Sequence, residues 1–481
     1  MLFFSPGIGA EYHIPDPRGA PRRLAQGWLL LGVAALAVSG LYSILIVLAR
    51  TPGVHDWLPW SDFFRPALVV HVNLAVAVWF IAFGGVLWSL DTASRSAGLG
   101  WAAFSLCALG TAVIATAPLA GPTYPLLNNY VPVLRQPYFF AGLAALGSGF
   151  ALLLARSFLA AAPLGSPFRG TGALRIGLRA AATTAAVALA AFAWSFIAIG
   201  EAAEGEGYFE YLFWGGGHLL QFTHTVLMLV CWAWLASVSG AQPPVTPKTA
   251  AWLFVAAALP AAGAIPIYLL HDVLSTGHRV AFTRLMEYGG LAAVPLGAVI
   301  AVALLRARHP DVGQRPLRAA LTASVMLFAT GGILGFLIRG TNVVVPAHYH
   351  GCIVGVTLAF MGLTYHLLDR LGFAPPAPRL AWLQPYIYGG GQLLHILGLA
   401  WSGGYGVQRK TASAAQVLEH LPEIAGMALM GLGGLIAIVG GLLFVIVVIW
   451  SAWTTRAAVR GRRRAGTAAR SGPLAGTRTA G

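Results

Sequence analysis

Long apolar runs constrain this chain more than any other feature of its sequence. Twelve runs are long enough to cross about 30 Å of hydrocarbon as helices that rise ~1.5 Å per residue. Only 9% of the residues are charged, whereas a soluble globule carries about 25%. The runs do not alternate polar and apolar residues, which excludes a water-filled β-barrel. We therefore predict an all-α integral membrane protein of twelve transmembrane helices. The predicted spans are 26–49, 66–90, 97–117, 137–160, 176–200, 209–237, 249–271, 286–305, 317–338, 343–368, 380–402 and 427–453.

The distribution of charge predicts the orientation of these helices. The chain has 30 Lys and Arg residues against 15 Asp and Glu, a net charge of +15. If both termini are cytoplasmic, most of the basic residues fall on the inner side, as the positive-inside rule requires. The localisation that we expect is a bacterial or archaeal inner (plasma) membrane, with the lipid bilayer as the surrounding partner. The basic stretch 460–464 is better explained by anionic lipid headgroups than by nucleic acid.

Three segments follow from this organisation. Residues 1–25 form a polar, proline-rich cytoplasmic segment, 26–453 form the membrane domain, and 454–481 form a basic cytoplasmic tail that we expect to be disordered. The three cysteines lie in apolar stretches without CxxC spacing, so neither a disulfide framework nor a thiolate metal site is indicated.

Histidine carries the chemical signal. Eight of the 13 histidines fall in or at the edge of a predicted span, and ionisable residues inside a membrane are candidates for function. With a cytoplasmic N-terminus, several of them share the outer half of the membrane, which unrelated packing residues have no reason to do. A common site in that layer is therefore predicted for His71, His218, His271, His348 and His350.

The spacing of His348 and His350 limits what that site can hold. Two residues apart on a helix, their imidazoles point about 200° away from each other and cannot ligate the same metal. Two large cofactors flanking the helix, one on each histidine, satisfy this geometry. A bis-histidine haem needs one more ligand, and His71 is the natural candidate.

A further set of donors lies in the same layer. These donors are His218, His271 and Asp272, and side chains of these types can hold a single non-haem metal with an open position for substrate. The alternative for Asp272 is a solvated helix end.

Two motifs resemble subunit I of the haem-copper oxidase superfamily. GGILG at 331–335 followed by TNVVVPAHYH at 341–350 resembles the glycine-rich helix 9 and the His-aromatic-His of helix 10 in that family. GQLLHILGL at 391–399 with Arg409 and Lys410 resembles helix 11 and the basic pair that holds haem propionates. The resemblance implies a twelve-helix bundle with two haems, which we expect to be of b type, and one metal beside the high-spin haem.

The resemblance also implies a role for each histidine. His71 and His350 would ligate the low-spin haem, His348 the high-spin haem, and His218 and His271 the adjacent metal. The remaining histidines are secondary: we expect His224 and His366 to pack structurally, His395 to lie near the propionates, and His278 and Glu287 to be possible extra ligands or acids.

Two departures from the family pattern bear on chemistry. The family normally has two consecutive histidines where this chain has His271-Asp272, and a carboxylate makes iron as credible as copper. Oxidases commonly place a tyrosine four residues after the helix 6 histidine, where this chain has Phe222. Tyr268 is the substitute phenol that the sequence offers.

Proton supply departs from the oxidase pattern too. The only lysines are Lys248, in an inner loop, and Lys410, outside, so the usual inner channel lacks its lysine. Glutamates cluster at the outer entrance of the sixth span. We expect protons to enter from outside through Glu206, Glu210 and Gln221; the alternative is a solvated loop.

These departures favour a nitric oxide reductase-like branch of the superfamily, an enzyme of respiration and denitrification that reduces NO to N2O. The chain has no CxxCH haem motif and no copper-binding cysteine pair. Electrons must therefore come from another subunit, cytochrome c-like or cupredoxin-like, at the outer face. An O2-reducing terminal oxidase and a non-catalytic membrane haem or metal protein remain as alternatives.

Overall fold

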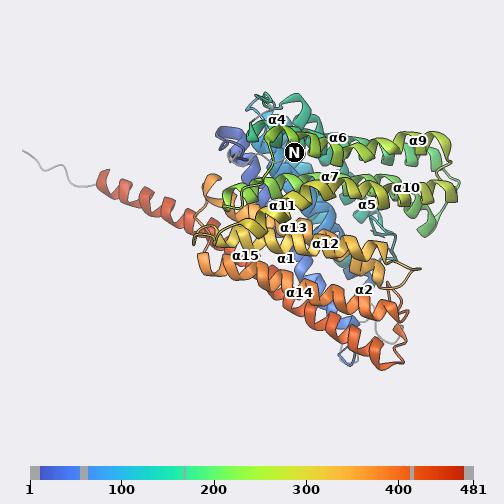
Figure 1. The fold of residues 1–481 in the computed structure, drawn as a ribbon. Coiled ribbons are helices and arrows are strands. Elements are labelled where there is room, and N and C mark those ends of the chain that lie inside the picture. The colour runs from blue at the N-terminus through green and yellow to red at the C-terminus, as the bar shows by residue number, and fades with distance from the viewer. Residues whose placement is uncertain (1–10, 55–62, 167–168, 412–415, 471–481) are drawn as a thin grey trace, which may run out of the picture.

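The computed structural model describes residues 11–54, 63–166, 169–411 and 416–470. Most helices lie side by side along one direction (Figure 1). Eleven helical spans within these residues are long and apolar enough to cross a membrane. The twelfth, α14, packs along α15. The prediction of an all-helical membrane bundle with twelve helices is confirmed.

The described spans are of two kinds: single unbroken helices, and helices interrupted by a short turn of another helical type. The helices that span the bundle without a break are α1 (Gly19–Arg50), α4 (Ala97–Thr116), α5 (Pro137–Leu159), α6 (Gly170–Ile199), α7 (Gly205–Val238), α12 (Arg315–Phe336), α13 (Val344–Arg370), α14 (Pro378–Gly404) and α15 (Leu421–Arg470). The broken spans are α2 (Phe64–Val72) with π-helix η3 (Asn73–Val78) and α3 (Trp79–Leu90), α8 (Pro247–Ala258) with η5 (Leu259–Gly263) and α9 (Ala264–Leu270), and α10 (Thr276–Gly289) with η6 (Gly290–Ala293) and α11 (Val294–Arg306).

The link between α4 and α5 contains the one small sheet of the described residues. A short 3-10 turn, η4 (Ala117–Leu119), follows α4, and β1 (Pro125–Leu126) then pairs antiparallel with β2 (Val133–Leu134). This link shares one end of the bundle with the loops that contain Asp272 and Arg409, which we call the Arg409 end. The opposite end, where the Tyr12 hydroxyl donates to the Val245 carbonyl at 3.0 Å, is the Tyr12 end.

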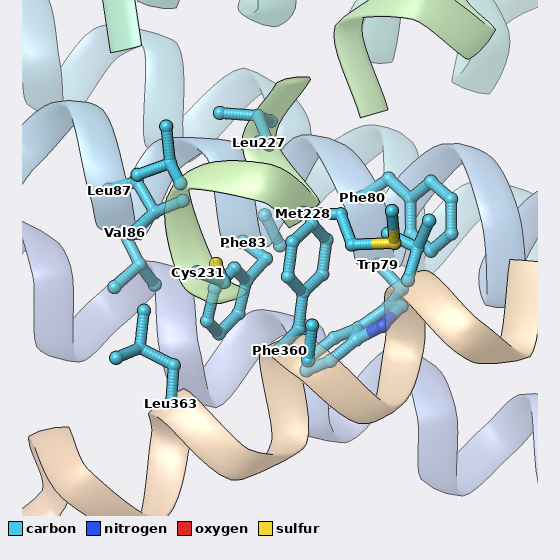
Figure 2. Packing of buried hydrophobic residues seen from close by; sticks show 14 of the residues in the cluster. Trp79, Phe80, Phe83, Val86, Leu87, Leu227, Met228, Cys231, Phe360 and Leu363 are labelled. Atoms are coloured by element: carbon cyan, nitrogen blue, oxygen red, sulfur yellow. The ribbon is translucent and has the colours of Figure 1, made fainter. Parts of the chain in front are cut away.

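The core is aromatic where α3, α7 and α13 meet. Figure 2 shows Trp79, Phe80 and Phe83 of α3 lying against Phe360 of α13. The rings of Phe83 and Phe360 stack with centroids 4.2 Å apart. The rings of His224 and Phe80 make an edge-to-face contact with centroids 4.5 Å apart, which is the packing role expected of His224 from its sequence position.

Bare backbone lets α12 and α13 approach closely. A Cβ added at Gly331 would lie 2.5 Å from the backbone nitrogen of Cys352, far inside van der Waals contact. Membrane helices associate through such small residues because lipid provides no hydrophobic drive for larger ones. The approach brings the first turns of α13, with their two histidines, against α12.

Two helix boundaries differ from the sequence prediction. The eighth span begins at Thr276 and not near 286, because Ser275 caps α10 by accepting a hydrogen bond from the His278 amide at 3.1 Å. Helix α15 continues to Arg470, so the disordered tail predicted from 454 is helical over its first part. Alanine and arginine are good helix formers, which accounts for the extension. Residues 471–481 lie outside the described part.

Candidate functional site

His348 and His350 leave α13 toward different neighbours. The Nδ1–H of His348 donates to the Gly331 carbonyl oxygen on α12 at 2.7 Å. The Nδ1–H of His350 donates to the Pro346 carbonyl oxygen at 2.8 Å, and its ring lies 5.0 Å from that of His395 on α14. The two imidazoles therefore face different helices, as their spacing requires.

His71 lies near the His350 side of α13. It stands two residues before π-helix η3, and its Nδ1–H donates to the Ser39 carbonyl oxygen at 3.1 Å. His395 is held in the same way, by the Met430 carbonyl oxygen at 3.0 Å. His71 and His395 both lie near His350. The structure thus gathers the residues predicted to ligate the low-spin haem, with His395 beside them.

His218 occupies a separate pocket on α7. Its side chain is buried, and its Nδ1–H donates to the Trp214 carbonyl oxygen at 2.7 Å. Its ring is surrounded by those of Tyr130 and Trp214, each 4.8 Å away, and of Phe282 at 5.8 Å.

These hydrogen bonds fix the chemistry of the imidazoles. A carbonyl oxygen only accepts, so Nδ1 carries the proton and Nε2 keeps its lone pair. That lone pair is what binds iron or another metal, and carbonyl contacts of this kind orient metal-ligating histidines. The arrangement fits metal or haem ligation at His71, His218, His348, His350 and His395.

His271 and Asp272 lie differently from the other predicted ligands. Both are exposed, in the turn that follows α9. An Asp272 carboxylate oxygen accepts a hydrogen bond from the Leu274 amide at 2.8 Å, and so shapes the turn. In the part of the chain that the structure describes, no group of three or more His, Cys, Asp and Glu side chains is arranged to hold a metal. The structure therefore does not bring His218, His271 and Asp272 together, and their joint role stays a prediction.

His278 is more deeply placed than its sequence position suggested. It is fully buried in the first turn of α10, and neither ring nitrogen has a hydrogen-bond partner among the described residues. Its ring lies 5.0 Å from Tyr268 and 4.9 Å from Phe282, the residue that also contacts His218. Sequence reasoning placed it in a loop; the capping Ser275 three residues before it was the signal for a helix start.

Arg409 and Lys410 are tied to the link between α4 and α5. The Arg409 guanidinium donates to the Asn129 side-chain oxygen at 2.8 Å, and the Lys410 ammonium donates to the Leu127 carbonyl oxygen. Burial, followed by the charge of Arg409, lowers the pKa of Lys410 from its ordinary value, and the carboxylate of Glu210 acts in the opposite direction. The structure thus places two cations side by side, and their role in holding haem propionates stays a prediction.

A polar chain connects this basic pair with His218. The Asn129 amide donates to a Glu210 carboxylate oxygen at 2.9 Å, and the Arg279 guanidinium lies 4.0 Å from that carboxylate. Arg279 also stacks over the Trp214 ring at 4.8 Å. The Trp214 carbonyl then holds His218. Glu210 is therefore linked to the His218 pocket, and Gln221 lies three residues after His218 on α7, whereas Glu206 is exposed in the first turn of α7.

The two phenols near His218 are used differently. Tyr268, the substitute expected from the sequence, has its hydroxyl 2.9 Å from the Ser195 hydroxyl and donates to the Ala191 carbonyl at 3.1 Å, on α6. Tyr130 packs directly on His218. Sequence reasoning missed Tyr130 because it lies in an irregular link, where no periodicity reports on contacts.

Comparisons with known proteins show the family and the fold. Residues 23–443 match the family model described as cytochrome c and quinol oxidase polypeptide I. The chain belongs to this family. It is therefore a haem-copper oxidase superfamily protein, and members of the family generally bind haems and a non-haem metal.

Similar proteins span nearly the same length. An uncharacterized protein of Rickettsia prowazekii (strain Madrid E) is 30% identical over 88% of this chain and 95% of its own. An uncharacterized protein of Aquifex aeolicus (strain VF5) is 29% identical over 72% of this chain and 85% of its own. A structure of a heme-copper terminal oxidase dimer superposes with a TM-score of 0.65 over 91% of this chain and 84% of that one, at 14% identity, which shows a common fold.

Proposed function

We propose that this membrane oxidoreductase reduces nitric oxide to nitrous oxide. Two NO molecules, two electrons and two protons give N2O and water. His71 and His350 would hold a low-spin haem, and His348 a high-spin haem, both of b type. Supporting this, all three imidazoles direct Nδ1–H to a backbone carbonyl and leave Nε2 for a metal. The haems and the non-haem metal supply the electron transfer.

The proposed non-haem metal, iron or copper, would take His218, His271 and Asp272. His218 is already oriented by Trp214, whereas the turn that carries Asp272 is exposed and would close on the ion. His278 supports a polar centre here, because a fully buried imidazole without a partner is costly in an apolar surrounding. This region therefore offers neutral imidazole and carboxylate donors, which suit iron at least as well as copper.

One observation carries the preference for NO over O2. Phe222, four residues after His218, is 1% exposed and packs against the backbone near Gly289. A phenol at that position of the helix supplies an electron and a proton for O–O cleavage in oxidases, and phenylalanine supplies neither. N–N bond formation needs no such group.

Protons would reach the site from the Arg409 end. Glu210 lies in the polar chain that ends at His218, and Glu206 stands at its mouth. Residues Arg409 and Lys410 hold that chain and would also neutralise haem propionates. We place this end outside and both termini in the cytoplasm. A cytochrome c-like or cupredoxin-like subunit would dock on this outer side as electron donor.

The second candidate function is O2 reduction, and Tyr130 favours it because it brings a phenol beside His218 from another part of the chain. The deciding experiment is turnover of purified protein with NO and with O2, using the same chemical reductant. We expect N2O formation to exceed O2 consumption at least tenfold. O2 consumption without N2O formation would overturn the proposal. A count of haem iron and other metal per chain identifies the cofactors independently of either assay.

A further inference from the structure

A fully buried arginine lies one turn before the end of α5, toward the Tyr12 end of the bundle. The Arg156 side chain is 0% exposed, and none of its three guanidinium nitrogens has a hydrogen-bond partner among the described residues. A guanidinium stays charged at physiological pH, and a buried charge without a partner is strongly unfavourable. Arg156 therefore needs an anion that the described part of the chain does not supply.

Bare backbone places Arg156 against the beginning of α4. A Cβ built at Gly100 would lie 2.8 Å from Nε of Arg156, so the guanidinium group rests directly on α4. Gly100 comes three residues after Ala97, the first residue of that helix. The same Cβ would lie 2.7 Å from a methyl carbon of Leu24 on α1. The first turns of α1 and α4 and the last turn of α5 therefore enclose the charge.

The beginning of α4 is suited to an anion. The first amides of a helix have no acceptor within the helix and carry the positive end of its dipole. No side chain caps α4 in the described structure, and its first turn contains no acidic residue. Ser96 and Gly98 are exposed, and no described atom lies within 4 Å of a Cβ built at Gly98. An anion can therefore reach these amides from the surface of the protein.

The link between α3 and α4 adds a second cation at this place. The Arg95 guanidinium donates to the Ala161 carbonyl oxygen at 3.4 Å, which holds this exposed side chain beside the end of α5. The carboxylate of the same link, Asp91, accepts a hydrogen bond from Arg175 at 2.8 Å and is thus already neutralised. The corner combines Arg95, Arg156 and an uncapped helix start.

We propose that Arg156 and the first-turn amides of α4 bind a phosphate group, with Arg95 at the rim of the site. Phosphate oxygens accept hydrogen bonds from helix N-termini and from guanidinium groups. One helical turn, about 5.4 Å, separates the two sets of donors, and one phosphate with hydrogen bonds on opposite sides covers that distance. The site is independent of the gas that the protein reduces.

A lipid headgroup and free inorganic phosphate both carry the required chemistry. The site lies where three membrane spans begin or end, which is the depth at which helices meet lipid headgroups. We therefore expect the phosphate to belong to a lipid of the adjacent leaflet, and the experiment distinguishes the two sources.

The test titrates the purified protein, in a phosphate-free maltoside detergent, with short-chain phosphatidylglycerol. Thermal unfolding reports binding, because a ligand of the folded state raises the unfolding midpoint. Arg156→Gln should weaken the apparent affinity at least tenfold, as loss of a charge-assisted hydrogen bond does. The control Arg306→Gln removes an arginine from the end of α11, at the same end of the bundle, and should change the affinity less than twofold. Equal affinities of the two variants would overturn the proposal.

A second pair of variants tests the site without changing Arg156. Gly98→Asp places a carboxylate at the exposed beginning of α4, where it should take the position of the phosphate and weaken phosphatidylglycerol binding at least tenfold. Gly98→Asn is the neutral control of matching size and should change binding less than twofold. If both variants bind phosphatidylglycerol as the unchanged protein does, the beginning of α4 is not part of a phosphate site.

Two further ligands identify the source of the phosphate. Inorganic phosphate should leave the unfolding midpoint unchanged if the site takes a lipid headgroup, and should raise it, in a way that requires Arg156, if the site takes free phosphate. A short-chain galactolipid has acyl chains but no phosphate and should have no effect that depends on Arg156. Equal shifts with the galactolipid and phosphatidylglycerol would show binding through acyl chains and would overturn the phosphate site.

Discussion

The two halves of the candidate site differ in how firmly hydrogen bonds hold their side chains. On the haem side, His71, His348 and His350 sit within helices, and each is oriented by a backbone carbonyl. On the metal side only His218 is held in this way. Neither ring nitrogen of His278 has a partner in the described part of the chain, and Asp272 belongs to an exposed turn.

The two halves differ in what fixes the positions of their side chains. Helix backbone is fixed by its own hydrogen bonds, so a histidine on it is oriented whether or not a cofactor is bound. A turn has few such bonds, and its side chains take their final positions when an ion draws them together. The proposed haem side is therefore preorganised, and the proposed metal side would need its metal for completion.

The largest expected effect is on the preorganised half. His350→Ala should remove the low-spin haem spectrum and leave the high-spin haem, whereas His348→Ala should do the reverse, because each imidazole faces a different neighbour. Optical spectra and haem extraction measure both. His366→Ala is the control, since this ring packs on Trp234 away from the site and its loss should leave both haems. Loss of the low-spin signal in His348→Ala would reverse the assignment.

The next effect separates the two kinds of donor on the metal side. Asp272→Ala should lose the non-haem metal while both haems remain, and Asp272→His should shift preference toward copper. His278→Ala should lower metal affinity about tenfold, as expected for a residue that supports ligands without being one. Metal analysis of the purified variants decides. Full occupancy in Asp272→Ala together with complete loss in His278→Ala would transfer the ligand role to His278.

What the sequence predicted well shares one property: it depends on local periodicity. Apolar runs located the spans, and the spacing of His348 and His350 correctly placed their rings toward different helices. The start of α10 was missed because its first turns are polar, so hydropathy alone begins the span too late. Tyr130 was missed because its position depends on the turn at Asn128 and on Gly217, far along the chain.

Changes to the proposed proton path should have a smaller effect on turnover, and they compare Glu210 with Glu206. Glu210 bridges Asn129 and Arg279, whereas Glu206 is exposed. Glu210→Gln should slow turnover about tenfold, at the lower end of effects for proton-transfer groups, with haem content unchanged. Glu206→Gln should slow it less than twofold. In liposomes with the Arg409 end outward, turnover should take protons from the outside and build no sustained membrane potential. Alkalinisation of the interior would contradict this path.

The smallest effect tests whether the basic pair serves the haem side electrostatically. Lys410 is partly buried and bonded to Leu127, so its charge is poorly screened by solvent. Removing a positive charge favours the oxidised haem, which carries more positive charge, and lowers its reduction potential. Coulomb's law at about 10 Å and an effective dielectric constant of about 20 gives a decrease of roughly 70 mV for Lys410→Gln. Lys248→Gln removes the only other lysine, at the start of α8 near the Tyr12 end, and should shift the potential by less than about 10 mV. Equal shifts in a redox titration of the two variants would show that the haem responds to net charge alone, and the anion site at Arg409 and Lys410 would lose its support.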